Sequence, residues 1–541
     1  MLRINPGTQS RTISVGLVLV VAMITGGWLL ERGTRSGVPQ TEAEAARLFD
    51  NVFAHVASNY VDSLSESAMY RMAVDGMLYH LEDPYTSLLA PEKLGRLNET
   101  TSGNYAGIGL QVDVRDGWIV VIAPTPGSPA ERAGIQPGDR IVEINGRSTQ
   151  GWTLEDAARS FRGEASTTLA LRLERLGMAN PVPLTLTRRP LHRSAVRRVA
   201  MLPNGIGYID LKAFSDSSDR ELSRGVDALV RRGAKSLILD LRSNPGGLLE
   251  QGTAVADLFL GPGQMIVSLR GRVPEANSEF TDSTSQKWPK LPLTILVDEK
   301  SASAAEIVAG ALQDNDRAVI VGESTYGKGS AQSVIPLGEV GGLKITTARW
   351  YTPSGRSISR QVPRGEEDPK PPAPTRYRTI SGRIVYDGGG ITPDVIESDS
   401  AFTQEIRDFQ SVLGRKVAQF RDALTDYARS LKANGGVSSQ QFAVTPAMLD
   451  EVWTRMSSRG VVMDRSIFDQ YQPVVSQLLA YDIARYVFGP EAEFKRRVAN
   501  DRAINTALDI STGATTQQAL LQKALSRQQA QLETASPTGR E

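Results

Sequence analysis

Apolar residues recur along this chain with different spacings, and each spacing predicts a different kind of secondary structure. Over residues 42–100 they return every three or four positions, which is typical of helices. Residues 102–189 instead hold short β-rich runs separated by glycine and proline turns. One short helix is expected here over residues 153–161, because Thr153 and Asp156 have the spacing of a capping box. A helical segment is thus followed by a β-rich domain.

Between residues 204 and 395 the pattern predicts alternating strands and helices. The continuous apolar runs 236–241 and 293–297 are typical of strands that are buried on both faces. Residues 248–260 between them are expected to form a helix, which gives a βαβ-like unit. The segment 363–376 is rich in proline and charge, so it is expected to run over the surface. This part of the chain is predicted to be an α/β core.

Beyond residue 400 the spacing is helical again. An apolar stripe from Phe402 to Leu431 predicts a helix that ends at Gly435-Gly436, and Thr445-Pro446 has the form of an N-cap with a first-turn proline. The last forty residues are rich in Gln, Thr, Ala and Ser and are expected to fray. The whole chain is predicted to be a multidomain α+β protein. Its expected divisions are an N-terminal anchor and linker (1–41), a helical segment (42–101), a β-rich domain (102–189), an α/β core (190–397) and a C-terminal helical extension (398–541).

The N-terminal segment contains an 18-residue run without a charge, residues 13–30, preceded by Arg3 and Arg11. This is the minimum length for a membrane span, it exceeds the usual signal-peptide core, and no clear A-x-A cleavage site follows it. We therefore predict an uncleaved single-pass anchor with the bulk of the chain exported. Arg32 and Arg35 on the far side weaken the positive-inside argument. A cleaved signal is the main alternative, and a buried core helix is the other.

Composition excludes several classes of function. The 541 residues carry a formal net charge of +1, so no basic excess points to nucleic acid. Cysteine is absent, which excludes a catalytic thiol, a cysteine-based zinc site and a lipoprotein anchor on cysteine. Only three histidines occur, His55, His80 and His192. A hydroxyl nucleophile further along the chain would therefore be expected to use another base, and lysine is the better candidate.

A run of small residues, 301–310, follows the second buried strand and leads into a helix. A serine in this position is most often an N-cap; that explains Ser301 well, and it would explain Ser303 too if nothing else were near. However, Lys328 lies 25 residues after Ser303 and is flanked by two glycines, which permit close backbone approach. Burial would lower the pKa of its amine toward the neutral form that a base requires. Gln332, four residues later, could hold the amine by hydrogen bonding.

The first buried strand ends in the turn Asn-Pro-Gly-Gly, residues 244–247. Such a turn exposes backbone at the carboxyl end of a strand, where ligands bind in α/β sheets, and exposed amides there could stabilise an oxyanion. Taken alone, the motif is better explained as an ordinary turn between a strand and a helix.

In the β-rich domain, the loop Gly107-Ile108-Gly109-Leu110 could offer consecutive backbone N–H groups to a carboxylate, and its sheet edge could add a peptide as an extra strand. This tetrapeptide alone is a weak signal. Combined with Ala-Gly-Ile-x-Pro-Gly-Asp-x-Ile-x-x-Ile-Asn-Gly at 133–146 it becomes a strong one. Residues 102–189 resemble a PDZ domain, which implies capture of a peptide C-terminus by the main chain of Ile108, Gly109 and Leu110. A PDZ fold that acts only as a spacer is the alternative.

Together the motifs resemble the carboxyl-terminal processing peptidases, the PDZ-containing serine peptidases of the S41 type. The resemblance covers roughly residues 45–397, and the serine-to-lysine spacing matches the family's. It implies that Ser303 is the nucleophile, Lys328 the general base and Gln332 the residue that orients it. The more distant Ser301 ranks below Ser303. The implied oxyanion donors are the backbone N–H groups of Ala304 and of Gly246 or its neighbour Gly247. The matching segments are 52–62, 81–85, 239–242, 244–247, 303–306, 327–332, 351–356 and 389–394.

The resemblance further implies a bacterial enzyme that hydrolyses peptide bonds in proteins recognised by their C-terminal tails, with the PDZ domain gating the site. No metal ion or other cofactor is implied. With the predicted anchor at 13–30, we expect the inner membrane and a catalytic part in the periplasm. A homodimer through terminal helices and an activating adaptor protein are further expectations; the stripe at 402–431 suits either a dimer contact or a lid on the core. A catalytically silent scaffold is the rival function.

Overall fold

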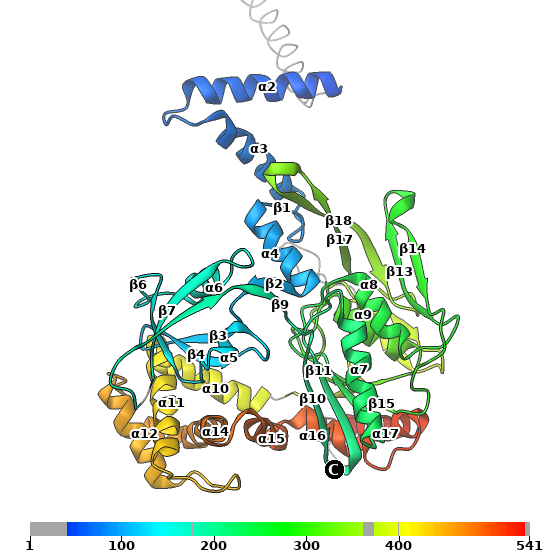
Figure 1. Cartoon of the computed structure of the whole chain (residues 1–541). Coiled ribbons are helices and arrows are strands. Elements are labelled where there is room, and N and C mark those ends of the chain that lie inside the picture. The colour runs from blue at the N-terminus through cyan, green and yellow to red at the C-terminus, as the bar shows by residue number, and fades with distance from the viewer. Residues whose placement is uncertain (1–40, 176, 361–372, 399, 536–541) are drawn as a thin grey trace, which may run out of the picture. The chain divides into compact units, whose positions relative to one another are not determined.

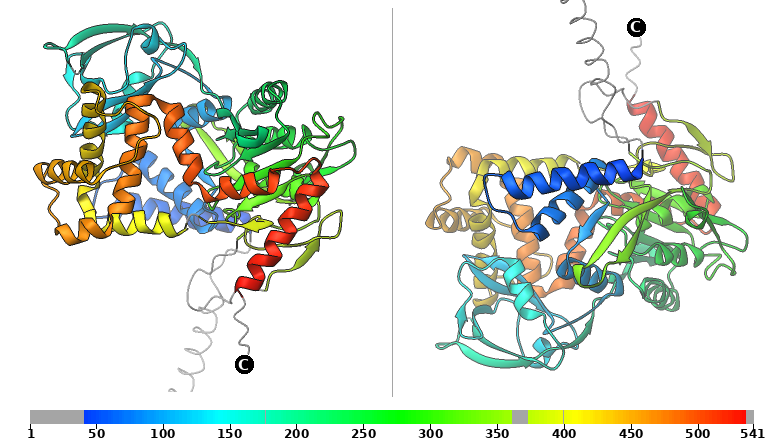
Figure 2. Two further views of the ribbon diagram at one scale, coloured as in Figure 1. Left: turned by 90° about the horizontal axis from the view of Figure 1, so that it is seen from below. Right: turned by 90° about the horizontal axis from the view of Figure 1, so that it is seen from above.

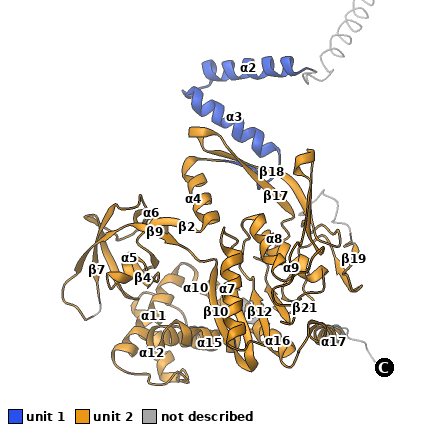
Figure 3. Cartoon of the chain, turned by 45° about the vertical axis from the view of Figure 1, so that its right-hand side comes forward, with its two compact units in different colours: residues 1–88 blue, residues 89–541 orange. Residues whose placement is uncertain are grey.

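The computed structural model (Figure 1) describes residues 41–175, 177–360, 373–398 and 400–535. It divides into two compact units, residues 1–88 and 89–541 (Figure 3). The predicted membrane segment at 13–30 lies outside the described residues. Within the described ranges, no helix combines the length and the apolar character needed to cross a bilayer.

The first unit contains two helices, α2 (Glu42–Asn59) and α3 (Glu66–His80), as the helical spacing predicted. Each begins at a hydroxyl N-cap, because Thr41 and Ser65 accept a backbone N–H of the first turn. The strand β1 (Ser87–Leu89) spans the boundary between the units, and α4 (Pro91–Ser102) opens the second.

The β-rich domain is an antiparallel sheet with the strand order β3-β4-β5-β7-β8, and β6 pairs with β5. Alternation in β7 places every second residue in the core, as expected for a sheet with one solvated face. The predicted capping box is confirmed, since Thr153 and Asp156 bond reciprocally at the start of α6. The elements are β3 (Leu110–Arg115), β4 (Trp118–Pro124), α5 (Pro129–Arg132), β5 (Arg140–Ile144), β6 (Arg147–Ser148), α6 (Leu154–Phe161), β7 (Thr168–Glu174) and β8 (Val182–Thr187).

The chain enters this domain through β2 (Asn104–Gly107) and leaves it through β9 (Arg189–His192), which pair antiparallel. It then forms a six-stranded sheet in the order β10-β11-β12-β15-β16-β21, parallel except for β10. Every residue of β12 and β15 is buried, which confirms the two strands predicted from continuous apolar runs. The strands are β10 (Val196–Leu202), β11 (Ile206–Leu211), β12 (Ser236–Asp240), β15 (Leu293–Val297), β16 (Val319–Gly322) and β21 (Val395–Ile396).

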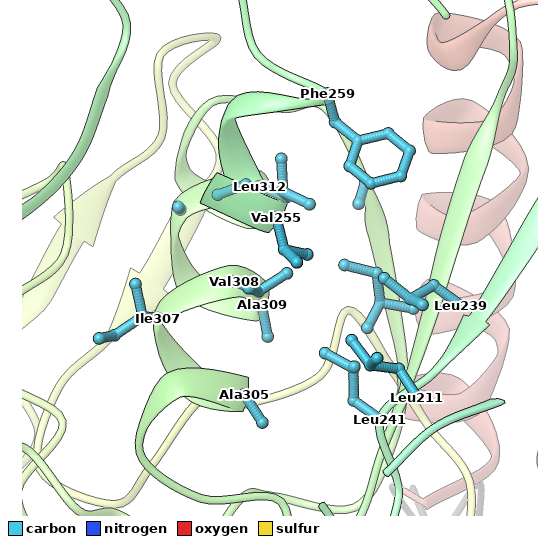
Figure 4. Packing of buried hydrophobic residues seen from close by; sticks show 14 of the residues in the cluster. Leu211, Leu239, Leu241, Val255, Phe259, Ala305, Ile307, Val308, Ala309 and Leu312 are labelled. Carbon is cyan, nitrogen blue, oxygen red and sulfur yellow. The ribbon is translucent and has the colours of Figure 1, made fainter. Parts of the chain in front are cut away.

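Helices α7 (Ser218–Arg231), α8 (Leu249–Asp257) and α9 (Ala304–Asp314) cover one face of this sheet. Figure 4 shows the contact between α9 and the sheet, where Val308 of α9 faces Leu239 and Leu312 lies beside Val255 of α8. An antiparallel sheet in the order β14-β13-β18-β17 completes the core. Its strands are β13 (Met265–Gly271), β14 (Ser278–Thr281), β17 (Ser330–Pro336) and β18 (Gly342–Tyr351), and a small hairpin joins β19 (Arg376–Arg378) to β20 (Ile384–Tyr386).

The C-terminal extension differs from its prediction in its first helix. The stripe at 402–431 is two helices, α10 (Ser400–Leu413) and α11 (Val417–Ala433), because Gly414 takes φ +52° and the chain turns there. Apolar residues of the stripe, such as Phe409 and Phe420, lie in the core of the extension's own bundle with α12 to α14, and the dimer contact and the lid stay predictions. The predicted N-cap at Thr445 is confirmed. The bundle is completed by α12 (Pro446–Ser458), α13 (Arg465–Gln470) and α14 (Gln472–Ile483).

The expected fraying of the last forty residues was wrong for those up to residue 535. After α15 (Pro490–Asn500), the helices α16 (Arg502–Ser511) and α17 (Gln517–Ala535) lie against the central sheet, on the face opposite α9 (Figure 2). Small side chains make this contact, among them Ala503, Ala507 and Ala524, which are buried. The helices therefore cover the second face of the sheet.

Candidate active site

Ser303 is the N-cap of α9, in the turn that follows β15. Its backbone has φ +56° and ψ −117°, a conformation that a residue with a side chain adopts only under strain. The helix N-terminus leaves amides unpaired by the helix itself and favours negative charge. The turn therefore holds a partly exposed serine hydroxyl where a developing anion would be stabilised.

The buried carboxylate of Glu306 joins the segment of Ser303 to that of Lys328. One oxygen, Oε2, accepts the backbone N–H of Ser303 at 2.8 Å and that of Lys328 at 3.0 Å. The other, Oε1, accepts the hydroxyl of Thr325 at 2.6 Å and the N–H of Gly327 at 2.7 Å. Burial raises the pKa of Glu306 above its ordinary value, and the four hydrogen bonds oppose that shift. A single side chain thus fixes the backbone of both segments of the predicted site, the turn at Ser303 and the segment at Lys328.

The glycines beside Lys328 are required by close backbone contacts. A Cβ on Gly327 would lie 2.9 Å from Arg360 Cβ, and one on Gly329 would lie 2.4 Å from Ser359 Oγ. Both distances are shorter than real Cβ atoms show, so the segment that carries Lys328 packs directly on residues 359–360. The side chain of Lys328 is partly buried.

Gln332 lies on β17, in register with Thr346 of β18. Its amide nitrogen donates to Ser330 Oγ at 2.9 Å and to Thr346 Oγ1 at 3.2 Å. These bonds fix the amide on the sheet at the start of β17. The role of Gln332 in orienting Lys328 stays a prediction.

The turn at 244–247 lies against the serine. A Cβ on Gly246, where φ is +94°, would lie 2.8 Å from Ser303 Cβ and 2.9 Å from the backbone nitrogen of Ala304. The carbonyl oxygen of Asn244 accepts the N–H of Ala302 at 2.9 Å, which ties the two loops together. The structure therefore brings together the predicted nucleophile and the predicted oxyanion donors.

The side chain of Asn244 distinguishes the two candidate glycines. This buried amide donates to the carbonyl of Leu211 at 2.8 Å, and its Oδ1 accepts the N–H of Gly246 at 2.9 Å. Because the N–H of Gly246 is bound in this way, the N–H of the exposed Gly247 is the better oxyanion donor. Sequence reasoning noted the motif but assigned no role to Asn244, although asparagine commonly bonds the backbone two residues on.

Ser301 has a structural role that differs from the one expected. The hydroxyl is fully buried; it donates to the carbonyl of Leu241 at 2.8 Å and accepts the N–H of Asp298 at 3.0 Å. It joins the ends of two neighbouring strands rather than capping α9, whose N-cap is Ser303. These bonds leave Ser303 as the better candidate nucleophile.

The predicted carboxylate-binding loop precedes β3, the edge strand of the β-rich domain. The carbonyls of Ile108 and Gly109 accept the N–H groups of Ala130 and Thr125, at 3.0 and 2.9 Å, and Gly109 also accepts the Ser128 hydroxyl. At Gly109, φ is +76° and a Cβ would lie 2.3 Å from Ser128 Cβ, so only glycine fits. Gly107 pairs with β9, and Leu110 begins the edge strand.

Glu306 is the functional candidate that sequence reasoning missed. It lies in the matching segment 303–306, and the sequence alone assigns it no role. Its position three residues after an N-cap serine is the signal of a capping box, which predicts the bond to Ser303 but not the bonds to residues 325–328. Among the described residues, no cluster of histidine and carboxylate side chains is arranged to hold a metal ion.

Comparison with known proteins agrees with this geometry. Residues 205–365 match the model of Peptidase family S41, and residues 120–175 match that of the PDZ domain. The chain is 37% identical over 329 residues to a carboxy-terminal-processing protease of Bartonella bacilliformis, covering 60% of this chain and 75% of that protein. It is 33% identical over 350 residues to the carboxy-terminal processing protease CtpA of Bacillus subtilis (64% and 74%). A carboxyl-terminal-processing protease of Synechocystis is 40% identical over 295 residues (53% and 68%).

These matches confirm the resemblance and the multidomain α+β architecture with a PDZ domain and a protease domain. They also support a serine peptidase activity. The chain belongs to peptidase family S41, the family of the carboxyl-terminal processing proteases.

Proposed function

We propose that this protein cleaves peptide bonds in proteins that it recognises by their C-terminal tails, with Ser303 as nucleophile and Lys328 as general base. The observation that carries the proposal is the shared oxygen of Glu306, which binds the backbone N–H of both residues. A strained serine at a helix N-terminus and a lysine held beside it by a buried carboxylate form a preorganised pair.

The chemistry follows the roles that these groups can play. The neutral amine of Lys328 takes the proton of Ser303 as Oγ attacks the scissile carbonyl carbon. The N–H groups of Ala304 and Gly247 donate to the tetrahedral oxyanion, and Gln332 orients the amine. Lys328 then gives the proton to the departing amine. In the second half, Lys328 takes a proton from water, whose oxygen attacks the acyl carbon. The bond to Ser303 Oγ then breaks, and Lys328 returns the proton to Oγ as the new carboxyl end is released.

The PDZ domain is proposed to capture the substrate tail and to gate access to the site. An extended tail would add to the edge of β3, and its carboxylate would lie at Ile108, Gly109 and Leu110. Whether a partner protein must activate the enzyme follows from comparing the full chain with and without candidate adaptors on one tail peptide.

We further propose that residues 13–30 anchor the protein in the bacterial inner membrane with the catalytic part in the periplasm; cleavage and export is the alternative. The basis is the uncharged run and its basic flank. Fractionation of cells, with the N-terminal sequence of the mature protein, separates the two. A homodimer through terminal helices would use the part of the extension that its own bundle leaves exposed, such as Val412, because other residues of the stripe at 402–431 are buried.

The nucleophile is tested with a fluorophosphonate probe and a tail-bearing peptide substrate. We expect the probe to label Ser303, and Ser303→Ala to lose both labelling and hydrolysis while its fold is retained. Ser333→Ala, on the exposed hairpin, is the matched serine control and should behave as the wild type. Hydrolysis at the wild-type rate by purified Ser303→Ala would refute the mechanism.

A further inference from the structure

The C-terminal extension reaches the carboxyl end of the central sheet, where the catalytic loops lie. The residue at this point is Asp501, the N-cap of α16, whose carboxylate accepts the N–H of Ile504 at 2.9 Å. The helix behind it is held on the sheet by buried Ala503, Ile504 and Ala507. The position of Asp501 is therefore fixed by the packing of α16.

The same carboxylate binds the guanidinium of Arg242. Nη1 of Arg242 lies 3.1 Å from Oδ1 and 2.9 Å from Oδ2 of Asp501. The other side of the guanidinium binds Asp240, with Nη2 at 2.7 Å from Oδ2 and Nε at 3.0 Å from Oδ1. Asp240 is buried and also accepts the hydroxyl of Tyr208 at 2.7 Å. One arginine fork is thus held between a carboxylate of the core and a carboxylate of the extension.

Arg242 begins the loop that carries the oxyanion donors. Its carbonyl accepts the Nζ of Lys212 at 2.6 Å, and Asn244 follows two residues later with its bonds to Gly246 and to Ala302. The loop is therefore fixed at its start by charged side chains and in its middle by an amide. A small displacement of its start would move the N–H of Gly247 relative to Ser303.

We propose that Asp501 is a positioning residue for peptide-bond hydrolysis: from the C-terminal extension it holds Arg242, and through it the loop whose Gly247 N–H binds the oxyanion. The inference rests on the proposed function. It makes the extension part of the active site, since a chain that ends before α16 would leave Arg242 with only one of its two carboxylate partners. The match to Peptidase family S41 ends at residue 365 and the PDZ match at residue 175, so neither includes Asp501 and its contact with Arg242.

The experiment compares the full-length wild type with Asp501→Asn. Asparagine is as good an N-cap as aspartate, so α16 stays capped, while the charge that holds Arg242 is lost. We expect kcat on a tail-bearing peptide to fall roughly ten- to hundred-fold, because a misplaced oxyanion donor costs that order of rate. KM should change by less than about twofold, since the substrate contacts are untouched.

A peptide aldehyde supplies a readout that a merely structural role would not move. Ser303 Oγ adds to its carbonyl carbon as Lys328 takes the hydroxyl proton; the C=O π bond opens, and the former carbonyl oxygen takes the place of the oxyanion. We expect its affinity for Asp501→Asn to fall by the same factor as kcat/KM. Asp501→Glu, which keeps the charge, should recover part of both losses.

Asp509→Asn is the matched control. It makes the same change on the same helix, at an exposed carboxylate that pairs with Arg527, and it should match the wild type. Thermal midpoints are measured for all variants, and every assay is run well below them. If Asp501→Asn melts near the assay temperature, Asp501→Ser, another strong N-cap, replaces it.

Two results would overturn the inference: a kcat for Asp501→Asn within about twofold of the wild type, or a loss of kcat without weaker aldehyde binding. Ser303→Ala is assayed alongside. Hydrolysis at the wild-type rate in that variant would refute the nucleophile itself, whereas an inactive Ser303→Ala beside a fully active Asp501→Asn would refute only the positioning role.

Discussion

The proposed catalytic segment and the proposed tail-binding edge are held in opposite ways. Around Ser303 and Lys328, the backbone is bound by the fully buried carboxylate of Glu306 and the glycines leave no spare volume. Along β3, by contrast, no residue is fully buried, and among the described strands it pairs with β4 alone. The difference matches the two tasks, because oxyanion stabilisation needs groups fixed in advance, while strand addition needs an open edge.

Replacing the base should give the largest effect. We expect Lys328→Ala to lower kcat by about a thousandfold or more while leaving affinity of the PDZ domain for a tail peptide unchanged. Lys328→Arg is the sharper variant, since a guanidinium stays protonated and cannot accept the proton of Ser303. Steady-state kinetics measure kcat, and calorimetry measures the affinity of the PDZ domain for the tail peptide. In the wild type, kcat/KM should fall as the pH is lowered, because a protonated amine accepts no proton. An active Lys328→Arg enzyme would contradict the assignment of the base.

The next largest effect is expected at Glu306, whose carboxylate links the segment of Ser303 to that of Lys328. In Glu306→Gln, an amide NH₂ would replace one carboxylate oxygen. It would then face either the backbone N–H groups of Ser303 and Lys328 or the N–H of Gly327 with the Thr325 hydroxyl, and at least one N–H donor would be left unsatisfied in a buried place. We expect kcat to fall roughly a hundredfold and the free energy of unfolding by about 1–3 kcal/mol. Glu339→Gln, on the exposed tip of the β17–β18 hairpin, is the control. If the variant lost stability but kept kcat, Glu306 would be a structural residue only.

The sequence predicted the parts of this site that depend on local pattern. Continuous apolar runs located β12 and β15, and the predicted Ser303 and Lys328 lie on two segments whose backbone N–H groups bind the same oxygen of Glu306. What it did not predict depends on contacts between distant segments. Nothing in the pattern around Glu306 shows that its carboxylate also binds residues 325–328, because a local capping box accounts for it.

The C-terminal error has a similar cause. Residues 502–535 looked frayed because alanine, glutamine and threonine give a weak apolar pattern. In the structure, small side chains such as Ala507 let α16 approach the sheet closely, so burial is achieved by shape rather than by large apolar groups. The break at Gly414 was missed since glycine within a helical pattern is usually tolerated.

In the loop that precedes the tail-binding edge, Gly109→Ala tests whether the backbone is as constrained as its geometry indicates. Its Cβ would meet Ser128 at 2.3 Å, so the loop must shift. We expect about a tenfold higher KM for a tail-bearing substrate with kcat nearly unchanged. Gly117→Ala is a matched control, since φ there is +74° but nothing lies near the added Cβ. An equal rise of KM in the two variants would mean that the rise comes from backbone strain at a positive φ and not from a displaced binding loop.

The smallest effect lies where the two regions join. Although burial opposes its ionisation, hydrogen bonds from Ser194, Ser217 and His192 lower the pKa of Glu221 to about 2. A carboxyl whose pKa is lower in the folded state stabilises the fold above its unfolded pKa, near 4.5, and loses that contribution as the pH falls toward 2.

Glu221→Gln should therefore lower the free energy of unfolding by about 1–2 kcal/mol at pH 7, with kcat within about twofold of the wild type. Urea titrations at pH 7, 4.5 and 3 measure the difference between the two proteins, which should narrow below pH 4.5. His192 lies on β9, the strand by which the chain leaves the tail-binding domain, and Glu221 lies on α7 of the core. A difference that stayed constant down to pH 3 would mean that the ionised carboxylate does not hold this junction, and that the catalytic and tail-binding regions are joined by packing alone.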